Sequence, residues 1–252
     1  MTLAASWNLD DPAVPDGSVR VGVVFVRHGE SEWNAQSRIQ GHQGGGLTST
    51  GKAQAQAAAE YLCRAYPAPS LVFTSDLHRS VQTAQIYMQH HGPANELRLD
   101  DRLREVDNGG WSGRLAADVA AAEASYILRI RNGEDLRRGG GESLSEAQAR
   151  IGDFCTEITA ELAREDPADR WAIAFGHGGP IRLAALAALG LPGTAVRLLG
   201  HSTNTAITEI EYWVPPDGTV PIARLLGYNS AQHLAVGLGG ASALHARPVP
   251  VN

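Results

Sequence analysis

The stretch Val19–Val26, VRVGVVFV, runs directly into Arg27-His28-Gly29-Glu30, and this junction indicates the fold class of the chain. The stretch is short and rich in β-branched residues, which is typical of a strand buried on both faces of a parallel sheet. The polar residues that follow predict that the strand ends there, with Arg27 and His28 at its carboxyl end. In open α/β sheets, ligands bind beyond that edge.

Segments with strand and helix patterns alternate along the rest of the chain. Further strands are expected at residues 71–74 (LVFT), 97–103, 171–175 (WAIAF) and 206–213. Helices are expected at 51–66 behind Thr50 as N-cap, at 76–90, near 115–131, from the capping box Ser143–Glu146 to residue 164, and after Pro180. This alternation predicts an α/β fold, a three-layer sandwich with a mostly parallel central sheet and helices on both faces.

The distribution of Gly, Pro and Asp predicts one domain with two loose ends. Residues 1–18 are expected to form a flexible arm, residues 19–235 the domain, and the Gly- and Ala-rich residues 236–252 a poorly ordered tail. Within the domain, the segment 106–141 contains two glycine runs and is harder to read than its surroundings. We interpret this segment as an insertion that roofs a site.

The composition excludes several classes of protein. The chain has 252 residues, of which 43% are hydrophobic and 19% charged, as in globular proteins. Its net charge of -6 argues against nucleic acid as a partner, since affinity for polyanions comes mainly from cationic residues. Two cysteines without a CxxC pair exclude a disulfide scaffold. No apolar run reaches the roughly 20 residues that span a membrane. Because the first 18 residues also lack a signal-peptide pattern, a cytoplasmic location without membrane contact is expected.

Three predicted strand ends lead to cationic side chains. The first strand ends in Arg27 and His28, the second leads to Arg79 in the first turn of a helix, and the third ends at His177 before a helix N-terminus. Buried cations are costly unless an anion balances them, and both Arg forks and helix N-termini suit phosphate oxygens. We therefore expect a site for a phosphoryl group, where one neutral imidazole acts as a nucleophile.

This chemistry also requires a proton donor for the leaving group. Glu105, which follows Leu103-Arg104 at an expected strand end, is the preferred candidate, with Asp107 and Glu142 as alternatives. The insertion also carries a basic cluster, which we interpret as a solvated face, with contact to an anionic substrate as the alternative: Arg129, Arg131, Arg137 and Arg138.

Several motifs follow one another at a specific spacing: Val26–Asn34 (VRHGESEWN), Gln40-Gly41, Leu47-Thr48 with Gly51, Ser75–Ala84 (SDLHRSVQTA), Leu103-Arg104-Glu105 and Gly176–Gly179 (GHGG). In this combination the sequence resembles the histidine phosphatase superfamily, which includes the cofactor-dependent phosphoglycerate mutases. The resemblance implies a phosphoglycerate mutase-like fold. It extends over roughly residues 20–210 in the family's order.

The resemblance also implies a role for each matching residue. His28 resembles the nucleophile that becomes phosphorylated, and Glu105 resembles the proton donor. Arg27, Arg79 and His177 resemble the catalytic phosphate pocket. The residues expected to contact the substrate or its phosphate are Asn34, Gln40, Gly41, Gly178 and Asn204. No metal and no cofactor are implied. The expected partner is a small-molecule phosphate ester, and a homodimer is an option because dimers are common among relatives.

Three functions remain open at this point. The mutases carry an Arg and a Tyr after the glutamate that would grip a phosphoglycerate, whereas the segment Glu105–Gly113 (EVDNGGWSG) has neither. We therefore favour a metal-independent phosphomonoester hydrolase that acts on a small phosphorylated metabolite. A phosphoglycerate mutase-type phosphotransferase is the alternative. A non-catalytic module that binds phosphate esters is less favoured, because His28 and Glu105 are both present.

Overall fold

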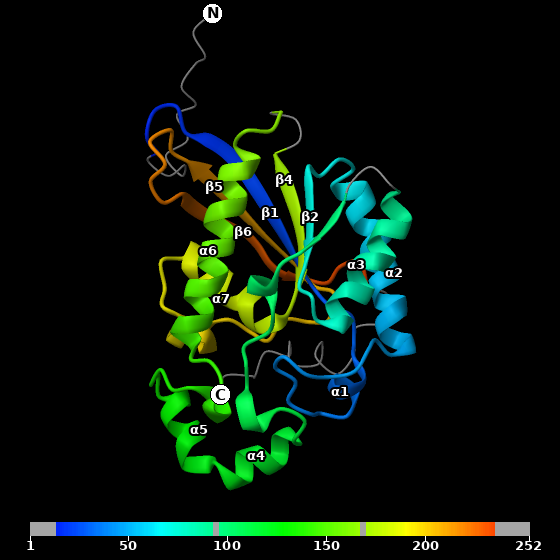
Figure 1. Ribbon diagram of the computed structural model, residues 1–252, viewed down its shortest axis with the longest axis vertical. Helices are drawn as coiled ribbons and strands as arrows, with labels where there is room; N and C mark the ends of the chain where they lie inside the picture. The colour runs from blue at the N-terminus through cyan, green and yellow to red at the C-terminus, as the bar shows by residue number, and fades with distance from the viewer. Residues whose placement is uncertain (1–13, 93–95, 167–169, 235–252) are drawn as a thin grey trace, which may run out of the picture.

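A single mixed sheet forms the centre of the molecule. The computed structural model describes residues 14–92, 96–166 and 170–234. Within these ranges six strands pair in the order β3-β2-β4-β1-β5-β6 (Figure 1). Their bounds are Val19–Arg27 (β1), Leu71–Thr74 (β2), Leu97–Leu99 (β3), Trp171–Gly176 (β4), Ile207–Val214 (β5) and Ile222–Ser230 (β6). Only β5 runs against the others, because its pairings with β1 and with β6 are antiparallel and the remaining pairings are parallel.

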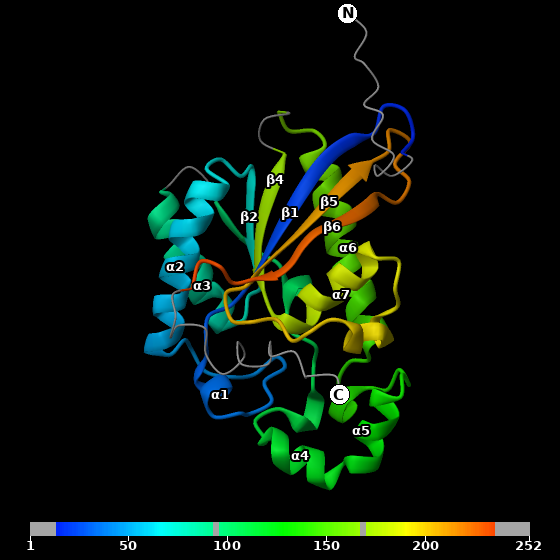
Figure 2. The ribbon, with the colours of Figure 1, turned by 180° about the vertical axis from the view of Figure 1, so that it is seen from behind.

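Helices cover both faces of this sheet, which confirms the predicted three-layer α/β sandwich. Helices α2 (Ser49–Ala65) and α3 (His78–His91) lie on one face, and α6 (Leu144–Leu162) and α7 (Gly178–Ala188) lie on the other (Figures 1 and 2). A four-residue helix, α1 (Glu32–Ala35), follows β1.

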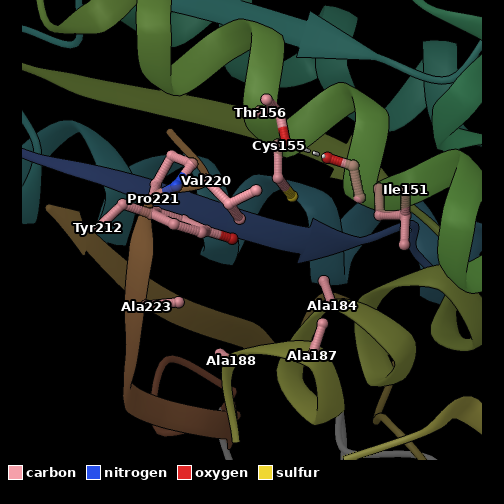
Figure 3. A pocket seen from close by; sticks show the side chains of 11 residues that line it. Ile151, Cys155, Thr156, Ala184, Ala187, Ala188, Tyr212, Val220, Pro221 and Ala223 are labelled. Carbon is pink, nitrogen blue, oxygen red and sulfur yellow. Dashed lines mark hydrogen bonds between the residues drawn. The ribbon is translucent and has the colours of Figure 1, made fainter. Parts of the chain in front are cut away.

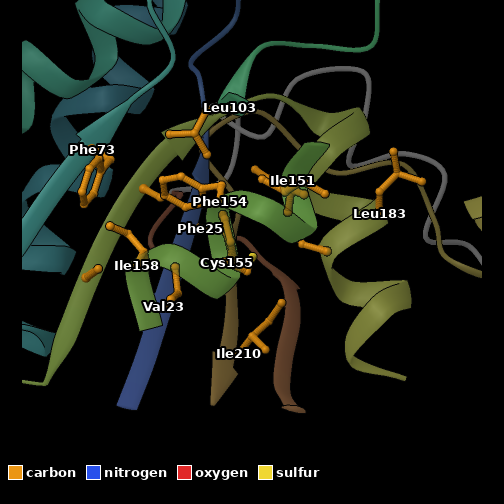
Figure 4. Close-up of a cluster of buried hydrophobic side chains, with 14 of the residues drawn as sticks. Val23, Phe25, Phe73, Leu103, Ile151, Phe154, Cys155, Ile158, Leu183 and Ile210 are labelled. Atoms are coloured by element: carbon orange, nitrogen blue, oxygen red, sulfur yellow. The ribbon is translucent and has the colours of Figure 1, made fainter. Parts of the chain in front are cut away.

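The alternation of side chains along β1 explains why both faces need a cover. Val23 and Phe25 belong to the hydrophobic cluster beneath α6 and α7, where Phe154 contacts Phe25 and Phe73 (Figure 4). The side chain of Val24 points to the opposite face and joins the cluster beneath α2 and α3. Because successive residues of a strand face opposite sides, the uninterrupted apolar run of β1 requires two covering layers.

The element boundaries differ from the prediction in a few places. Helix α2 begins at Ser49 with Thr48 as N-cap, not Thr50, because the Thr48 hydroxyl accepts a hydrogen bond from Gly51 N at 2.9 Å. The strand predicted at 97–103 stops at Leu99 and is followed by a 3-10 turn over Asp101–Leu103. Glu105 therefore lies in a loop after this turn and not at a strand end. Strand β6 was not predicted, since it is half-buried along nearly its whole length and shows no in-out alternation.

The segment interpreted as an insertion lies beyond the carboxyl ends of the parallel strands. It holds two short helices, α4 (Ala116–Ala122) and α5 (Ala124–Arg131), in place of the single helix predicted near 115–131 (Figures 1 and 2). The predicted tail 236–252 and residues 1–13 of the predicted arm lie outside the described residues. None of the helices in the described ranges combines the length and the apolar character that crossing a membrane requires.

The core cluster beneath α6 generates a stability prediction. Phe154 is fully buried, so Phe154→Ala removes an aromatic ring between β1, β2 and α6 and leaves a cavity. We expect a loss of about 3–5 kcal/mol in the free energy of unfolding, measured as a lower urea midpoint at unchanged slope. Leu128→Ala on α5, where the side chain is exposed, is the control and should change it by less than about 0.5 kcal/mol. A Phe154→Ala loss no larger than that of the control would contradict this packing.

Candidate active site

The carboxyl ends of β1 and β4 bring the two predicted histidines together. The strands are in parallel register with Arg27 opposite Gly176, and His28 N donates to Gly176 O at 2.9 Å. The imidazoles of His28 and His177 are therefore neighbours, with ring centroids 5.0 Å apart. Both side chains are almost completely buried.

A cavity of about 220 Å³ opens beside His28. Seven of the ten predicted site residues line it: Arg27, His28, Asn34, Gln40, Gly41, Glu105 and Gly178. The other three contact His28 from within the protein. Arg79 hydrogen-bonds its ring, His177 lies against its ring, and Asn204 donates to its backbone carbonyl at 3.0 Å. The structure thus brings all ten predicted residues into one site.

Two hydrogen bonds fix the protonation and tautomer of His28. Its Nδ1 lies 2.7 Å from Gly29 O, which can only accept, so Nδ1 carries the proton. Its Nε2 lies 3.2 Å from Arg79 Nε, which can only donate, so Nε2 holds a lone pair. Burial lowers the pKa of His28 well below its usual value, and the charges of Arg79 and Arg27 lower it further. His28 is therefore a neutral imidazole with its lone pair on Nε2.

The backbone around His28 is held by a close approach of two glycines. A Cβ on Gly29 would lie 2.3 Å from Gly51 O, and a Cβ on Gly51 would lie 2.0 Å from Glu30 O. Only glycine permits this contact, which seats the turn after β1 against the first turn of α2. The Thr48 hydroxyl, which caps α2, also donates to the Glu30 carboxylate at 2.8 Å.

Arg79 joins His28 to the glycine-rich loop 41–46. Besides its bond to His28, its guanidinium donates to Gly41 O at 2.8 Å and to Gln43 O at 2.9 Å. Burial lowers the pKa of Arg79 to about 10, and Glu105 opposes the shift. Arg79 therefore remains a cation at neutral pH, one hydrogen bond away from the His28 ring.

Some buried polar atoms at this site have no hydrogen-bond partner within the described ranges. They include Arg27 Nε, His177 Nδ1 and Ser202 Oγ. The other nitrogen of His177, Nε2, lies 3.0 Å from Ser75 Oγ, and Arg27 also donates to Ser202 O. Burial lowers the pKa of His177 well below its usual value, with Arg79 as the second cause. Since buried polar atoms usually have hydrogen-bond partners, a ligand that carries oxygens would suit these atoms.

Glu105 lies at the N-terminus of α7. It lines the same cavity as the arginines and carries the opposite charge. Its Oε1 accepts hydrogen bonds from Val106 N at 2.9 Å and Gly179 N at 3.0 Å. The two rival carboxylates have other partners and do not line the cavity. Glu142 pairs with Arg150 at 2.8 Å, and Asp107 Oδ1 accepts from Gly109 N at 2.9 Å. Of the three candidates, only Glu105 is positioned to meet a ligand.

A small polar network holds the amide side chains at the cavity wall. The Ser31 hydroxyl lies within hydrogen-bond distance of Asn34 Oδ1 (3.1 Å) and of Gln40 Oε1 (2.9 Å). Asn204 donates to the same Asn34 oxygen at 3.3 Å. Because Asn204 also donates to His28 O, the network ties β1 to the loop before β5.

The cavity also includes residues outside the ten predicted site residues, among them Arg138, for which substrate contact was the alternative interpretation. These are Arg38, Asn108, Arg138, Gly179, Arg182, His201 and Ser202. A signal existed for Arg182, because it lies one helical turn beyond Gly178 and so shares its face of α7. The arginines of the basic cluster in the insertion have different surroundings in the structure. Arg129 pairs with Glu134 and Arg137 with Glu146, whereas Arg138 faces the cavity.

A second cavity, of about 140 Å³, lies between α6, α7 and the β5–β6 pair (Figure 3). Ile151, Ala184 and Val220 are among its mostly apolar lining residues, and none of the described residues that line it is charged. Burial raises the pKa of the lining thiol of Cys155 to about 11. Because thiolate is the reactive form of cysteine, this shift disfavours reaction of Cys155 at neutral pH.

Comparisons with known proteins agree with this geometry. The family described as the histidine phosphatase superfamily (branch 1) matches residues 23–215. A glucosyl-3-phosphoglycerate phosphatase of Mycobacterium tuberculosis is 34% identical over 197 residues, which make up 77% of this chain and 86% of the relative. A probable phosphoglycerate mutase, GpmB, of Salmonella paratyphi C is 35% identical over 192 residues, 75% of this chain and 84% of the relative.

Solved structures show the same fold. A mycobacterial glucosyl-3-phosphoglycerate phosphatase, solved in complex with inorganic phosphate, has a TM-score of 0.73 and 30% sequence identity to this chain. The likeness covers 85% of this chain and 100% of that protein. The sequence match, the shared architecture and the paired histidines at the sheet edge lead to one assignment: this chain belongs to branch 1 of the histidine phosphatase superfamily.

Proposed function

We propose that this protein hydrolyses phosphate monoesters of small metabolites through a phosphohistidine formed on His28. The observation that carries the proposal is the state of the His28 ring: its two hydrogen bonds, taken together, require a proton on Nδ1 and a lone pair on Nε2, which is a neutral imidazole. A nucleophilic nitrogen beside the guanidiniums of Arg27 and Arg79 suits attack on an anionic phosphoryl group. The relatives named as phosphatases support the same chemistry.

In the first step, a phosphate ester binds with its oxygens toward Arg27, Arg79 and His177. One of these oxygens takes over the hydrogen bond of Arg79 Nε, which frees the lone pair of His28 Nε2. Nε2 then forms a bond to phosphorus as the ester P–O bond breaks. Glu105 gives its proton to the departing alkoxide, which leaves as an alcohol.

In the second step, water takes the place of the alcohol. Glu105, now a carboxylate, accepts a proton from the water as its oxygen attacks phosphorus. The N–P bond breaks, its electron pair returns to Nε2, and inorganic phosphate is released. The Nδ1–H bond to Gly29 O stabilises the positive charge that the ring carries while it is phosphorylated.

Hydrolysis is favoured over phosphoryl transfer to a second metabolite. In place of the Arg and Tyr expected in a mutase, the segment after Glu105 supplies Asn108 to the cavity wall and then a turn of two glycines. The mutase alternative predicts that labelled phosphate passes to an acceptor metabolite faster than to water.

The nucleophile is tested by His28→Ala. We expect the variant to release p-nitrophenol from p-nitrophenyl phosphate at least about a thousandfold more slowly, because no other group takes up the phosphoryl unit. His90→Ala, at the exposed end of α3, is the matched control and should keep its activity. Acid-quenched wild-type protein should retain radioactive phosphate, and the His28→Ala variant should not. A variant that keeps most of its activity would contradict the assignment.

The tautomer and charge of His28 generate a pH prediction. Because burial and the charges of Arg79 and Arg27 lower the pKa of His28, its ring stays neutral as the pH falls through 6.5. An imidazole ¹⁵N NMR titration should therefore place the His28 midpoint well below 6.5. Arg79→Met should raise this midpoint, since a neighbouring positive charge is removed. A His28 ring that is protonated at pH 6.5 in the wild type would overturn the prediction.

The proton donor is tested by the leaving group. Glu105→Gln should slow the hydrolysis of an alkyl phosphate about 100-fold or more, because an alkoxide cannot leave without a proton. The same variant should slow p-nitrophenyl phosphate much less, since p-nitrophenolate leaves readily. Asp107→Asn is the control and should affect both esters alike. Equal losses on the two esters in Glu105→Gln would assign Glu105 a positioning role instead.

A further inference from the structure

We infer that Arg138 selects substrates that carry a second oxyanionic group, such as a carboxylate, in addition to the phosphate. This inference rests on the proposed function, because it concerns the part of the same cavity that lies outside the phosphate pocket. It makes Arg138 a specificity-determining residue, and it makes the substrate a compact, doubly anionic phosphate ester.

Arg138 differs from the other cavity arginines in having an uncommitted guanidinium. Arg27 donates to Ser202 O, and Arg182 donates to the carbonyls of Val196 and Leu199. Arg38 donates to Gly113 O at 2.7 Å. The guanidinium of Arg138 makes no hydrogen bond or ion pair with any residue in the described ranges, although it lines the cavity. Its five N–H donors are therefore available to a ligand.

The backbone that carries Arg138 is held firmly in place. Arg138 begins a 3-10 turn, Arg138–Gly140, that packs against the turn Gly109–Trp111. Gly109 and Gly139 both have positive φ, and a Cβ on either would lie within 2.4 Å of backbone oxygen in the other segment. Only a pair of glycines permits this contact. The Arg138 Cα is thus fixed relative to the loop that carries Glu105.

The second anchor of this turn is a pair of charges. Glu142 pairs with Arg150 and also accepts a hydrogen bond from Asp107 N at 2.9 Å. Arg138 N donates to Glu142 O at 3.0 Å, which closes the turn. A guanidinium on such a fixed backbone loses less freedom on binding than one on a mobile loop, so it can discriminate between ligands.

The charge balance of the cavity favours a second anion. Four arginines, Arg27, Arg79, Arg138 and Arg182, feel the field of one carboxylate, Glu105. Burial lowers the pKa of the Arg138 guanidinium, Glu105 opposes this shift, and Arg182 adds to it. One phosphate engages the cations around His28, and a further oxyanion would engage Arg138 in the same partly desolvated space.

Two phosphate esters of matched shape test the inference. 3-Phosphoglycerate and glycerol 3-phosphate differ only in a carboxylate that replaces a hydroxymethyl group. Their inhibition constants are measured as competitors of p-nitrophenyl phosphate hydrolysis. We expect 3-phosphoglycerate to bind the wild type at least about tenfold more tightly. Arg138→Ala should weaken its binding about 10- to 100-fold, with less than a threefold change in the inhibition constant of glycerol 3-phosphate.

Two variants serve as controls. Arg137→Ala removes the neighbouring guanidinium, which pairs with Glu146 on the exterior, and should leave both inhibition constants unchanged. Arg138→Lys should restore part of the preference, because it keeps the charge but not the planar fork. Circular dichroism and thermal melts should show that all three variants are folded.

Failure of the inference and failure of the proposed function give different results. The inference alone is overturned if turnover of p-nitrophenyl phosphate depends on His28 but the wild type binds the two esters with equal affinity. It is also overturned if Arg138→Ala weakens the binding of both esters equally. Turnover that does not depend on His28 overturns the proposed function. In that case calorimetric affinities of the two esters for the wild type and Arg138→Ala still decide the role of Arg138.

Discussion

The site depends on the hydrogen bond between His28 Nδ1 and the carbonyl of the next residue, Gly29. This bond fixes which ring nitrogen carries the proton and so which nitrogen is a base. The hydrogen bond forms because the chain turns immediately after β1. This turn packs closely against α2, and only glycine at positions 29 and 51 permits the contact. The end of the apolar strand and the contact between the two glycines therefore together determine the orientation of the His28 ring.

The electrostatic design of the site places more positive than negative charge in a poorly hydrated space. Burial is the first cause of the lowered pKa of His28, His177, Arg27 and Arg79 alike. The two histidines are therefore neutral, whereas Arg27 and Arg79 remain charged, and the cost of burying these two guanidiniums would be offset by a bound oxyanion. The helix N-terminus of α7 differs from this pattern, because its Gly179 N–H contacts Glu105. A sequence motif of glycines before a helix indicated a phosphate site there, and the structure shows the proton-donor candidate in that position instead.

The sequence predicted the parts of the site that follow directly from strand ends. Arg27, His28 and His177 leave parallel strands at one edge, so their meeting follows from the topology. Arg138 could not be assigned in the same way, because its position depends on contacts between two glycine turns 30 residues apart in the chain. Strand β6 was missed for a related reason, since its burial is even along the strand and gives no period-2 pattern. The N-cap of α2 was misplaced by two residues because Thr48 and Thr50 are equivalent by composition. The hydrogen bonds of the Thr48 hydroxyl with Gly51 N and with the Glu30 carboxylate separate them.

The two glycine turns of the insertion, Gly109–Trp111 and Arg138–Gly140, have a consequence for how the substrate preference of this protein can change. The contact between Gly109 and Gly139 is made by backbone alone, so it places residue 138 at the cavity whatever its side chain. The groups proposed to bind the phosphoryl unit are Arg27, His28 and His177 at the strand ends and Arg79 in α3, whereas residue 138 belongs to a separately anchored turn. An exchange at this one position could therefore redirect the enzyme toward a new metabolite while leaving its reaction chemistry intact.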